Sequence, residues 1–375
     1  MKSKKIEKTI KSCIAMAVML LAGGFVGYLA GAHMHLSGKG ELYFFAMLLL
    51  LYVSLLLQII FYEGGHLVFG LLTGYGFSSF RIGSLMLLKN KKGLHFKLLK
   101  LAGTGGQCLM TAPEPKDGMI PVVLYNLGGP LMNFITAGLA LLLRAAFPMP
   151  DLLSDFFLEL GGIGLALGLF NGIPLHAGGI DNDGMNAISM TRSPVSNRAF
   201  QIQLNINAGT AEGIRLKDMP EAWFTLPAEE DMKNPMIAAL AVFAENRLMD
   251  EHKFPEAKAL CDRLLEMESG MVGIYRNLIT CDRIYLELMG EGDPAVLKSM
   301  LSKPLLQFIK SMKNFPTVLR TRYAIALLKD REEDVAETLS LQFEKVAKRY
   351  PSESDVQSER KLMDLAKAEY DRRIQ

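Results

Sequence analysis

The sequence contains few cysteines and has a small net charge. The four cysteines, Cys13, Cys108, Cys261 and Cys281, are scattered and form no CxxC pair, so neither a thiolate metal centre nor a disulfide scaffold is predicted. Lys and Arg number 41 and Asp and Glu 39, which leaves a net charge of +2 and gives no argument for a nucleic-acid partner. The glycine-rich stretch 104–107 does not end in Lys-Ser/Thr, so a phosphate-binding loop is not predicted there.

Apolar residues make up half of the 375 positions, which is high for a soluble protein. They are concentrated before about residue 190, where apolar runs alternate with short polar links, whereas charged, helix-forming sequence follows about residue 210. We therefore expect a mainly α fold: a polytopic membrane domain over residues 1–192, a linker over 193–234 and a soluble α-helical domain over 235–375.

Four segments are apolar enough to cross a bilayer, which takes about 20 residues. They are residues 12–32, 42–72, 119–143 and 152–175, the last with Asp155 and Glu159 near its start. Lysines precede the first segment and Ala30-Gly31-Ala32 resembles a signal-peptide cleavage site. Its uncharged stretch is longer than the usual apolar region of about 7–15 residues in signal peptides, which favours a retained span.

Basic residues alternate between the two sides of these spans. The N-terminus is rich in lysine and the link 73–118 carries seven Lys and Arg residues, whereas the link 33–41 carries one. Because basic loops stay in the cytoplasm, we expect a cell-membrane protein whose N-terminus, 73–118 link and C-terminal part are cytoplasmic.

The basic link contains two β-prone apolar runs around the turn sequence KNKKG, which predicts a β-hairpin over about residues 78–102. Two roles are open for it. The hairpin could pack on the protein or on the membrane surface, or its edge strand could pair with an extended peptide.

Ionisable residues inside the second span indicate a functional site, since such groups are costly at membrane depth. Glu63 and His66 are three residues apart and so share one helix face. They could form a base beside a metal ligand, or simply satisfy each other as two buried polar groups. A second polar cluster, Asn171–Gly184, follows the last span and is expected on the same side as His66.

Three motifs in order resemble the site-2 protease family of intramembrane zinc metallopeptidases, especially its bacterial members. Residues 62–66, YEGGH, stand where the family has HExxH, and residues 129–133, GPLMN, match its GPxxN segment. Residues 171–174, NGIP, followed by Asp183-Gly184, match its NxxP…DG segment. The resemblance covers about residues 40–195.

This resemblance implies hydrolysis of a membrane-anchored protein near the cytoplasmic face of the lipid bilayer. It assigns Glu63 as the general base and His66 and Asp183 as ligands of Zn²⁺. Asn133 and Asn171 would position the substrate or the active-site loop.

Tyr62 departs from the family pattern, because it replaces the first His of HExxH. A phenol with a pKa of about 10 must lose its proton before it binds zinc, whereas neutral imidazole binds directly. Three alternatives stay open: Tyr62 binds as phenolate, His176 supplies the missing nitrogen ligand, or the chain is a catalytically silent binding protein. His176 could also be only a polar residue at the membrane interface.

The C-terminal region has a helical pattern that resembles tetratricopeptide repeats. Residues 235–268 contain KFPEAKALCDRLLEME, and residues 316–351 read similarly and end in proline. The pattern predicts a small α-solenoid of about three helical pairs, with a plain helical bundle as the alternative. Since solenoids bind peptides and proteins, we expect a protein partner for this domain.

Overall fold

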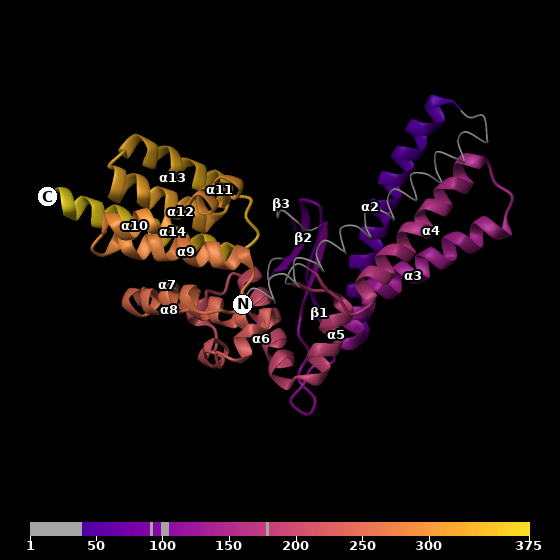
Figure 1. The fold of residues 1–375 in the computed structure, drawn as a ribbon, viewed down its shortest axis with the longest axis horizontal. Coiled ribbons are helices and arrows are strands. Elements are labelled where there is room, and N and C mark those ends of the chain that lie inside the picture. Colours follow the sequence, from indigo (N-terminus) through magenta and orange to yellow (C-terminus); the bar gives the residue numbers. More distant parts are fainter. Residues whose placement is uncertain (1–39, 91–92, 99–104, 178–179) are drawn as a thin grey trace, which may run out of the picture. The chain divides into compact units, whose positions relative to one another are not determined.

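The computed structural model describes residues 40–90, 93–98, 105–177 and 180–375 (Figure 1). The predicted first span, residues 12–32, lies outside this described part. Within it the fold is mainly helical with a small antiparallel sheet, as expected. The described residues divide into two compact units, one formed by residues up to Val68 together with Leu124–Ile188, the other by Phe69–Val123 together with Ser189–Gln375.

Three helices are long and apolar enough to cross a membrane: α2 (Glu41–Leu72), α3 (Val123–Ala146) and α4 (Asp151–Gly172). They coincide with the predicted segments 42–72, 119–143 and 152–175, and the two later helices are displaced at their ends by local chemistry. Helix α3 starts only after Pro121, beyond a β-bridge between Lys116 and Met119. Helix α4 ends before Pro174, because the residue that precedes a proline avoids the helical region.

Buried polar groups join the three helices of the first unit. The Gln58 side chain on α2 donates a hydrogen bond to the Leu160 carbonyl of α4 (2.9 Å) and accepts one from the Thr136 hydroxyl of α3 (3.1 Å). Gly164 makes room for it, since a Cβ there would lie 2.5 Å from Gln58 Nε2. A hydrogen bond from the Tyr43 hydroxyl to the Asp155 carboxylate joins α2 and α4 again. These contacts fix which faces of the apolar helices meet.

The β-structure is a sheet of four antiparallel strands in the order β3-β2-β1-β4. Their bounds are β1 (Gly76–Ile82), β2 (Leu85–Asn90), β3 (Gly93–Leu98) and β4 (Gly106–Thr111). The first predicted run is divided into β1 and β2 by a turn in which Gly83 adopts φ +57°, a conformation that favours glycine. The edge strand β3 exposes Leu94, Phe96 and Leu98, so the described part of the chain leaves this apolar face uncovered.

The rest of the second unit is helical, and α7 to α14 form one stack of helices (Figure 1). The helices are α6 (Pro194–Ala211), α7 (Pro235–Asp250), α8 (Phe254–Glu266), α9 (Gly273–Met289), α10 (Pro294–Met300), α11 (Lys303–Ser311), α12 (Pro316–Ala324), a π-helix (Ile325–Asp330), α13 (Glu333–Ala347) and α14 (Glu353–Ile374). Short 3-10 helices cover Leu216–Asp218, Glu221–Phe224 and Asp231–Lys233.

Helical pairs occur at both positions where the repeat pattern predicts them. Helices α7 and α8 occupy the first predicted unit, residues 235–268, and α12 and α13 with the intervening π-helix occupy the second, residues 316–351. The segment 193–234, expected to be a linker, contains helix α6, whose Ile202 and Ile206 are buried in the same core as α7, α9 and α12. The hydrophobic core of this unit is therefore continuous from α6 to α14.

Candidate functional site

Two side chains of the first unit converge on one carboxylate, that of Asp183. Helix α2 carries Tyr62 and His66 one turn apart on the same face, and helix α5 (Asp183–Arg192) begins with Asp183. The Tyr62 hydroxyl donates a hydrogen bond to Asp183 Oδ2, and His66 Nε2 lies 3.4 Å from the same oxygen. The Tyr62 and His66 rings meet edge to face, with 4.8 Å between their centroids. We call these three residues the Tyr62 cluster.

The His66 ring is oriented by a backbone contact on its far side. Its Nδ1 atom lies 2.8 Å from the Tyr125 carbonyl oxygen, and since a carbonyl only accepts, Nδ1 carries a proton and donates. Nε2 therefore faces Asp183. Histidines that bind metals have this same arrangement, with the second nitrogen fixed by an outer hydrogen bond.

Two glycines provide the space in which the cluster forms. A Cβ at Gly129 on α3 would lie 2.6 Å from His66 Nε2 and 2.7 Å from the Tyr62 ring. A Cβ at Gly65 on α2 would lie 2.2 Å from the Gly128 carbonyl oxygen. Helices α2 and α3 can thus approach closely at this height only because both positions lack a side chain.

Asn182 holds the segment that carries Asp183. Its side-chain amide donates to the carbonyls of Phe170 (2.7 Å) and Ile173 (2.6 Å). Its side-chain oxygen accepts from the backbone amides of Leu175 and Met185, both at 3.0 Å. The full hydrogen-bonding capacity of the carboxamide is thereby used, and it ties the end of α4 to the start of α5.

Sequence reasoning did not select Asn182, although a signal was present. Asparagine is a preferred N-cap residue, because its side-chain oxygen can accept a hydrogen bond from the backbone N–H of the third residue of the helix. Asn182 directly precedes α5 and accepts such a bond from Met185.

The other predicted site residues on α2, α3 and α4 are Glu63, Asn133 and Asn171. Glu63 is buried, with 6% of its surface exposed, beside Tyr62 in the chain. Asn133 is completely buried, and neither its carboxamide oxygen nor its nitrogen has a hydrogen-bond partner among the residues that the structure describes. Asn171 donates to the Leu167 carbonyl within α4 (3.1 Å). The structure therefore does not hydrogen-bond either asparagine to the Tyr62 cluster.

His176 is placed away from Asp183. It lies on β5 (His176–Ala177), which pairs with β6 (Ile180–Asp181), and its Nδ1 atom forms an ion pair with the Asp181 carboxylate. Its side chain is 67% exposed. The imidazole proposed as a replacement ligand is thus bound to a different carboxylate.

The donor set of the cluster does not fit the zinc site of the resembled family. It offers one imidazole, one carboxylate and one phenol, where three strong ligands are usual. The phenol is present as a proton donor to Asp183, whereas zinc would require its phenolate. Across the residues that the structure describes, no three His, Cys, Asp or Glu side chains are grouped to hold a metal ion.

Compared with protein-family models, curated proteins and solved structures, the chain matches none of them.

Proposed function

We propose that the chain is a site-2 protease-like membrane protein that binds a membrane-anchored protein near the cytoplasmic face without cleaving it. The observation that carries this proposal is the hydrogen bond from the Tyr62 hydroxyl to Asp183. It joins α2 to the start of α5 at the point where the resembled family has its metal. A direct hydrogen bond to a carboxylate can make this connection without an ion.

Loss of the metal would remove the chemistry that hydrolysis needs. In zinc peptidases the ion acidifies a water molecule and polarises the scissile carbonyl. Without it, the Glu63 carboxylate has no activated water from which to take a proton. The arrangement of the three helices and the segment 171–186 would still form a surface for a partner.

The membrane placement belongs to the same proposal. The three apolar helices α2, α3 and α4 support insertion, and the seven basic residues of the link 73–118 support a cytoplasmic position for the sheet. The C-terminal helical pairs would then also be cytoplasmic, where a soluble partner could reach them.

A second candidate is an active peptidase in which Tyr62 binds zinc as phenolate. The orientation of His66, with Nδ1 bonded to the Tyr125 carbonyl and Nε2 facing Asp183, favours it. This is the orientation that metal-binding histidines have.

Zinc stoichiometry separates the two candidates. We expect the purified full chain to hold far less than one zinc per molecule after equilibration with excess Zn²⁺ and desalting. Tyr62→His should bring the content close to one, because it supplies a second imidazole. One zinc per molecule in the natural chain, lost in Tyr62→Phe, would establish the peptidase instead.

Cleavage is the second measurement. A single-span membrane protein with a cytoplasmic tag is co-expressed with the natural chain or with Glu63→Gln. We expect intact substrate in both. Cleavage by the natural chain that Glu63→Gln abolishes would overturn the proposed function.

A further inference from the structure

The helical part of the second unit encloses a cavity that the proposed function does not use. Its volume is about 380 Å³, within the range of about 300–1,000 Å³ that is usual for ligand sites. Residues of α6, α7, α9, α12 and α14 line it, together with residues of strand β4. The cavity thus lies along one face of successive helices.

Carboxylates outnumber cations in the lining of this cavity. Asp250, Asp282, Asp355 and Glu359 face a single lining cation, Arg320. The Arg320 guanidinium is completely buried and is shared by two of these carboxylates, since it bonds to Asp282 and, through Nε at 2.9 Å, to Glu359.

The two remaining carboxylates differ in their partners. Asp250 accepts from Arg215 Nε at 3.0 Å and from the Lys217 backbone amide at 3.2 Å. Asp355 interacts with the Ser352 side chain through a hydrogen bond, and among the residues that the structure describes it forms no ion pair with an arginine or lysine. It lies one turn before Glu359 on α14, so the two form a like-charge pair, which destabilises a helix.

The electrostatics of the cavity reflect this surplus. Burial raises the pKa of Asp282 to about 7, a net value that includes the opposing effect of Arg320 and a smaller increase caused by the nearby Glu359. Burial raises the pKa of Asp355 to about 6; the hydrogen bond with Ser352 opposes this rise, and the nearby Glu359 and Asp250 add to it. A cation brought into the cavity would favour the ionised form of both groups.

Two aromatic rings also line the cavity, and one of them, Tyr350, is close enough to Asp355 and Glu359 for their charges to act on it. Phe315, just before α12, and Tyr350, just before α14, meet edge to face with 6.0 Å between their centroids. Thr317, two residues after Phe315, also lines the cavity, and its hydroxyl donates a hydrogen bond to Glu359. Aromatic faces combined with carboxylates are the usual recognition elements for ammonium and guanidinium groups.

We propose that this cavity binds an ammonium or guanidinium group, with Asp355 and Glu359 as its carboxylate partners and the Phe315 and Tyr350 rings beside it. Two sources share this chemistry: a free amine, or the Lys or Arg side chain of a protein partner. The proposal does not depend on the Tyr62 cluster or on whether the chain is a peptidase.

Calorimetry on the full chain in detergent tests it with two cationic probes. One is arginine amide, and the other is a short peptide with alternating Arg and Ser. The same peptide with Gln in place of Arg serves as the uncharged probe. Binding of both cationic probes indicates a site for free amines, and binding of the peptide alone indicates a protein partner. No binding of either cationic probe, or equal binding of the Gln peptide, overturns the proposal.

Variants then assign the binding to the cavity. Asp355→Asn should weaken binding of the cationic probe by about 10- to 100-fold, as expected for loss of a hydrogen bond to a charged group. Asp355→Glu, which keeps the charge, should retain most of it.

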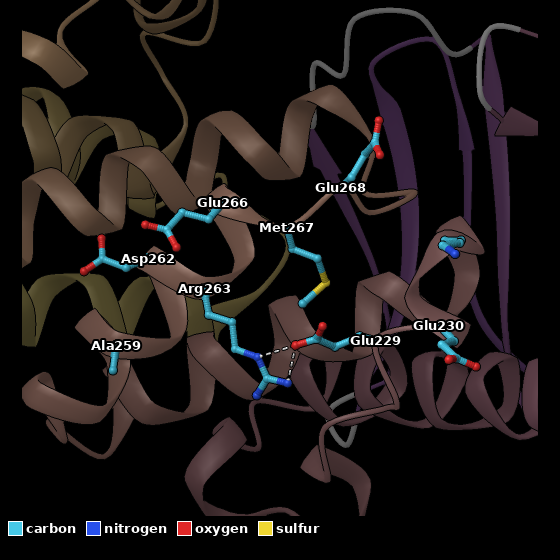
Figure 2. Close-up of a pocket in the computed structure, with 9 residues that line it drawn as sticks. Glu229, Glu230, Ala259, Asp262, Arg263, Glu266, Met267 and Glu268 are labelled. Atoms are coloured by element: carbon cyan, nitrogen blue, oxygen red, sulfur yellow. Dashed lines mark hydrogen bonds and ion pairs between the residues drawn. The ribbon is translucent and has the colours of Figure 1, made fainter. Parts of the chain in front are cut away.

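The matched control is an acidic hollow outside the cavity, shown in Figure 2. Glu266, Glu268 and Asp262 line this hollow together with Arg263, which is ion-paired with Glu229. Glu266→Gln should leave binding unchanged. An equal loss in Glu266→Gln and Asp355→Asn would mean nonspecific attraction to acidic surface and would refute the site.

Hydrogen exchange on the natural chain provides a test that requires no variant. Probe binding should slow exchange of the backbone amides at the start of α14, which include Asp355 N–H, bonded to Ser352 Oγ at 3.2 Å. Unchanged exchange there at saturating probe would contradict the proposal even if a variant failed to fold.

Discussion

Removing the Tyr62 hydroxyl should loosen the segment that carries Asp183. In Tyr62→Phe the ring can keep its place, but Asp183 Oδ2 loses its hydrogen-bond donor. The nearest remaining partner, His66 Nε2 at 3.4 Å, is beyond the 2.7–2.9 Å that is usual for a bond between charged groups. The contact between α2 and the start of α5 is therefore weakened at a single atom.

The size of the effect follows from the burial of the carboxylate. A hydrogen bond to a charged group contributes about 1.5–3 kcal/mol. The Asp183 side chain is 17% exposed, so water can partly replace the lost donor and the lower end of that range applies. A change of about 1.5–2 kcal/mol corresponds to a roughly 10- to 30-fold increase in local opening, since about 1.4 kcal/mol is tenfold.

Hydrogen exchange measures this opening directly. The backbone amides of Leu175, Asn182 and Met185 all bond within the segment, and we expect them to exchange about 10- to 30-fold faster in Tyr62→Phe. The Ile120 amide, which bonds to Asn197 in the other unit (2.9 Å), should be unchanged. Tyr52→Phe is the control, because Tyr52 is 65% exposed on the same helix. Equal exchange in Tyr62→Phe and Tyr52→Phe would refute the structural role of the hydroxyl.

Three further predictions concern stability. In Gly129→Ala the new Cβ would lie 2.6 Å from His66 Nε2, so a denaturant titration should show the first unit destabilised by about 1–3 kcal/mol. The control is Gly138→Ala, whose Cβ would have nothing within 4 Å and which should not be destabilised. Asn182→Ala removes four hydrogen bonds and should lower the free energy of unfolding by at least the roughly 1 kcal/mol of a lost N-cap. An unfolding midpoint equal to that of the natural chain would contradict the role of Asn182 in holding α4 and α5 together. Because burial raises the pKa of Asp355 to about 6, from about 3.9 when unfolded, the folded state binds the extra proton. Stability from this group is therefore complete below about pH 4 and is lost as pH rises through 6. The urea midpoint of the natural chain should thus fall more between pH 5 and pH 8 than that of Asp355→Asn, and parallel profiles would contradict this assignment.

Periodicity and turn chemistry defined most of the fold in advance. The apolar runs at 42–72, 119–143 and 152–175 are longer than the apolar stretches of helices in soluble proteins. Each corresponds to a helix that is long enough to cross a membrane. Helical pairs arose where the repeat pattern recurs. The sheet was foreseen less completely, because the tolerance of Gly83 for positive φ divides one apolar run into two strands, and β4 had no distinct signal.

The candidate site shows most clearly what the sequence predicts and what depends on the tertiary structure. Sequence alone determined that Glu63 and His66 share a helix face, that Asp183 starts a separate segment and that Tyr62 stands where a zinc-binding histidine would be expected. Only the tertiary structure decided which partners these side chains have. It brings the Tyr62 hydroxyl to a carboxylate 121 positions later and pairs His176 with Asp181. Helical spacing fixes neighbours within four residues, whereas partners on different elements depend on how closely those elements pack. Here that depends on glycines such as Gly65 and Gly129.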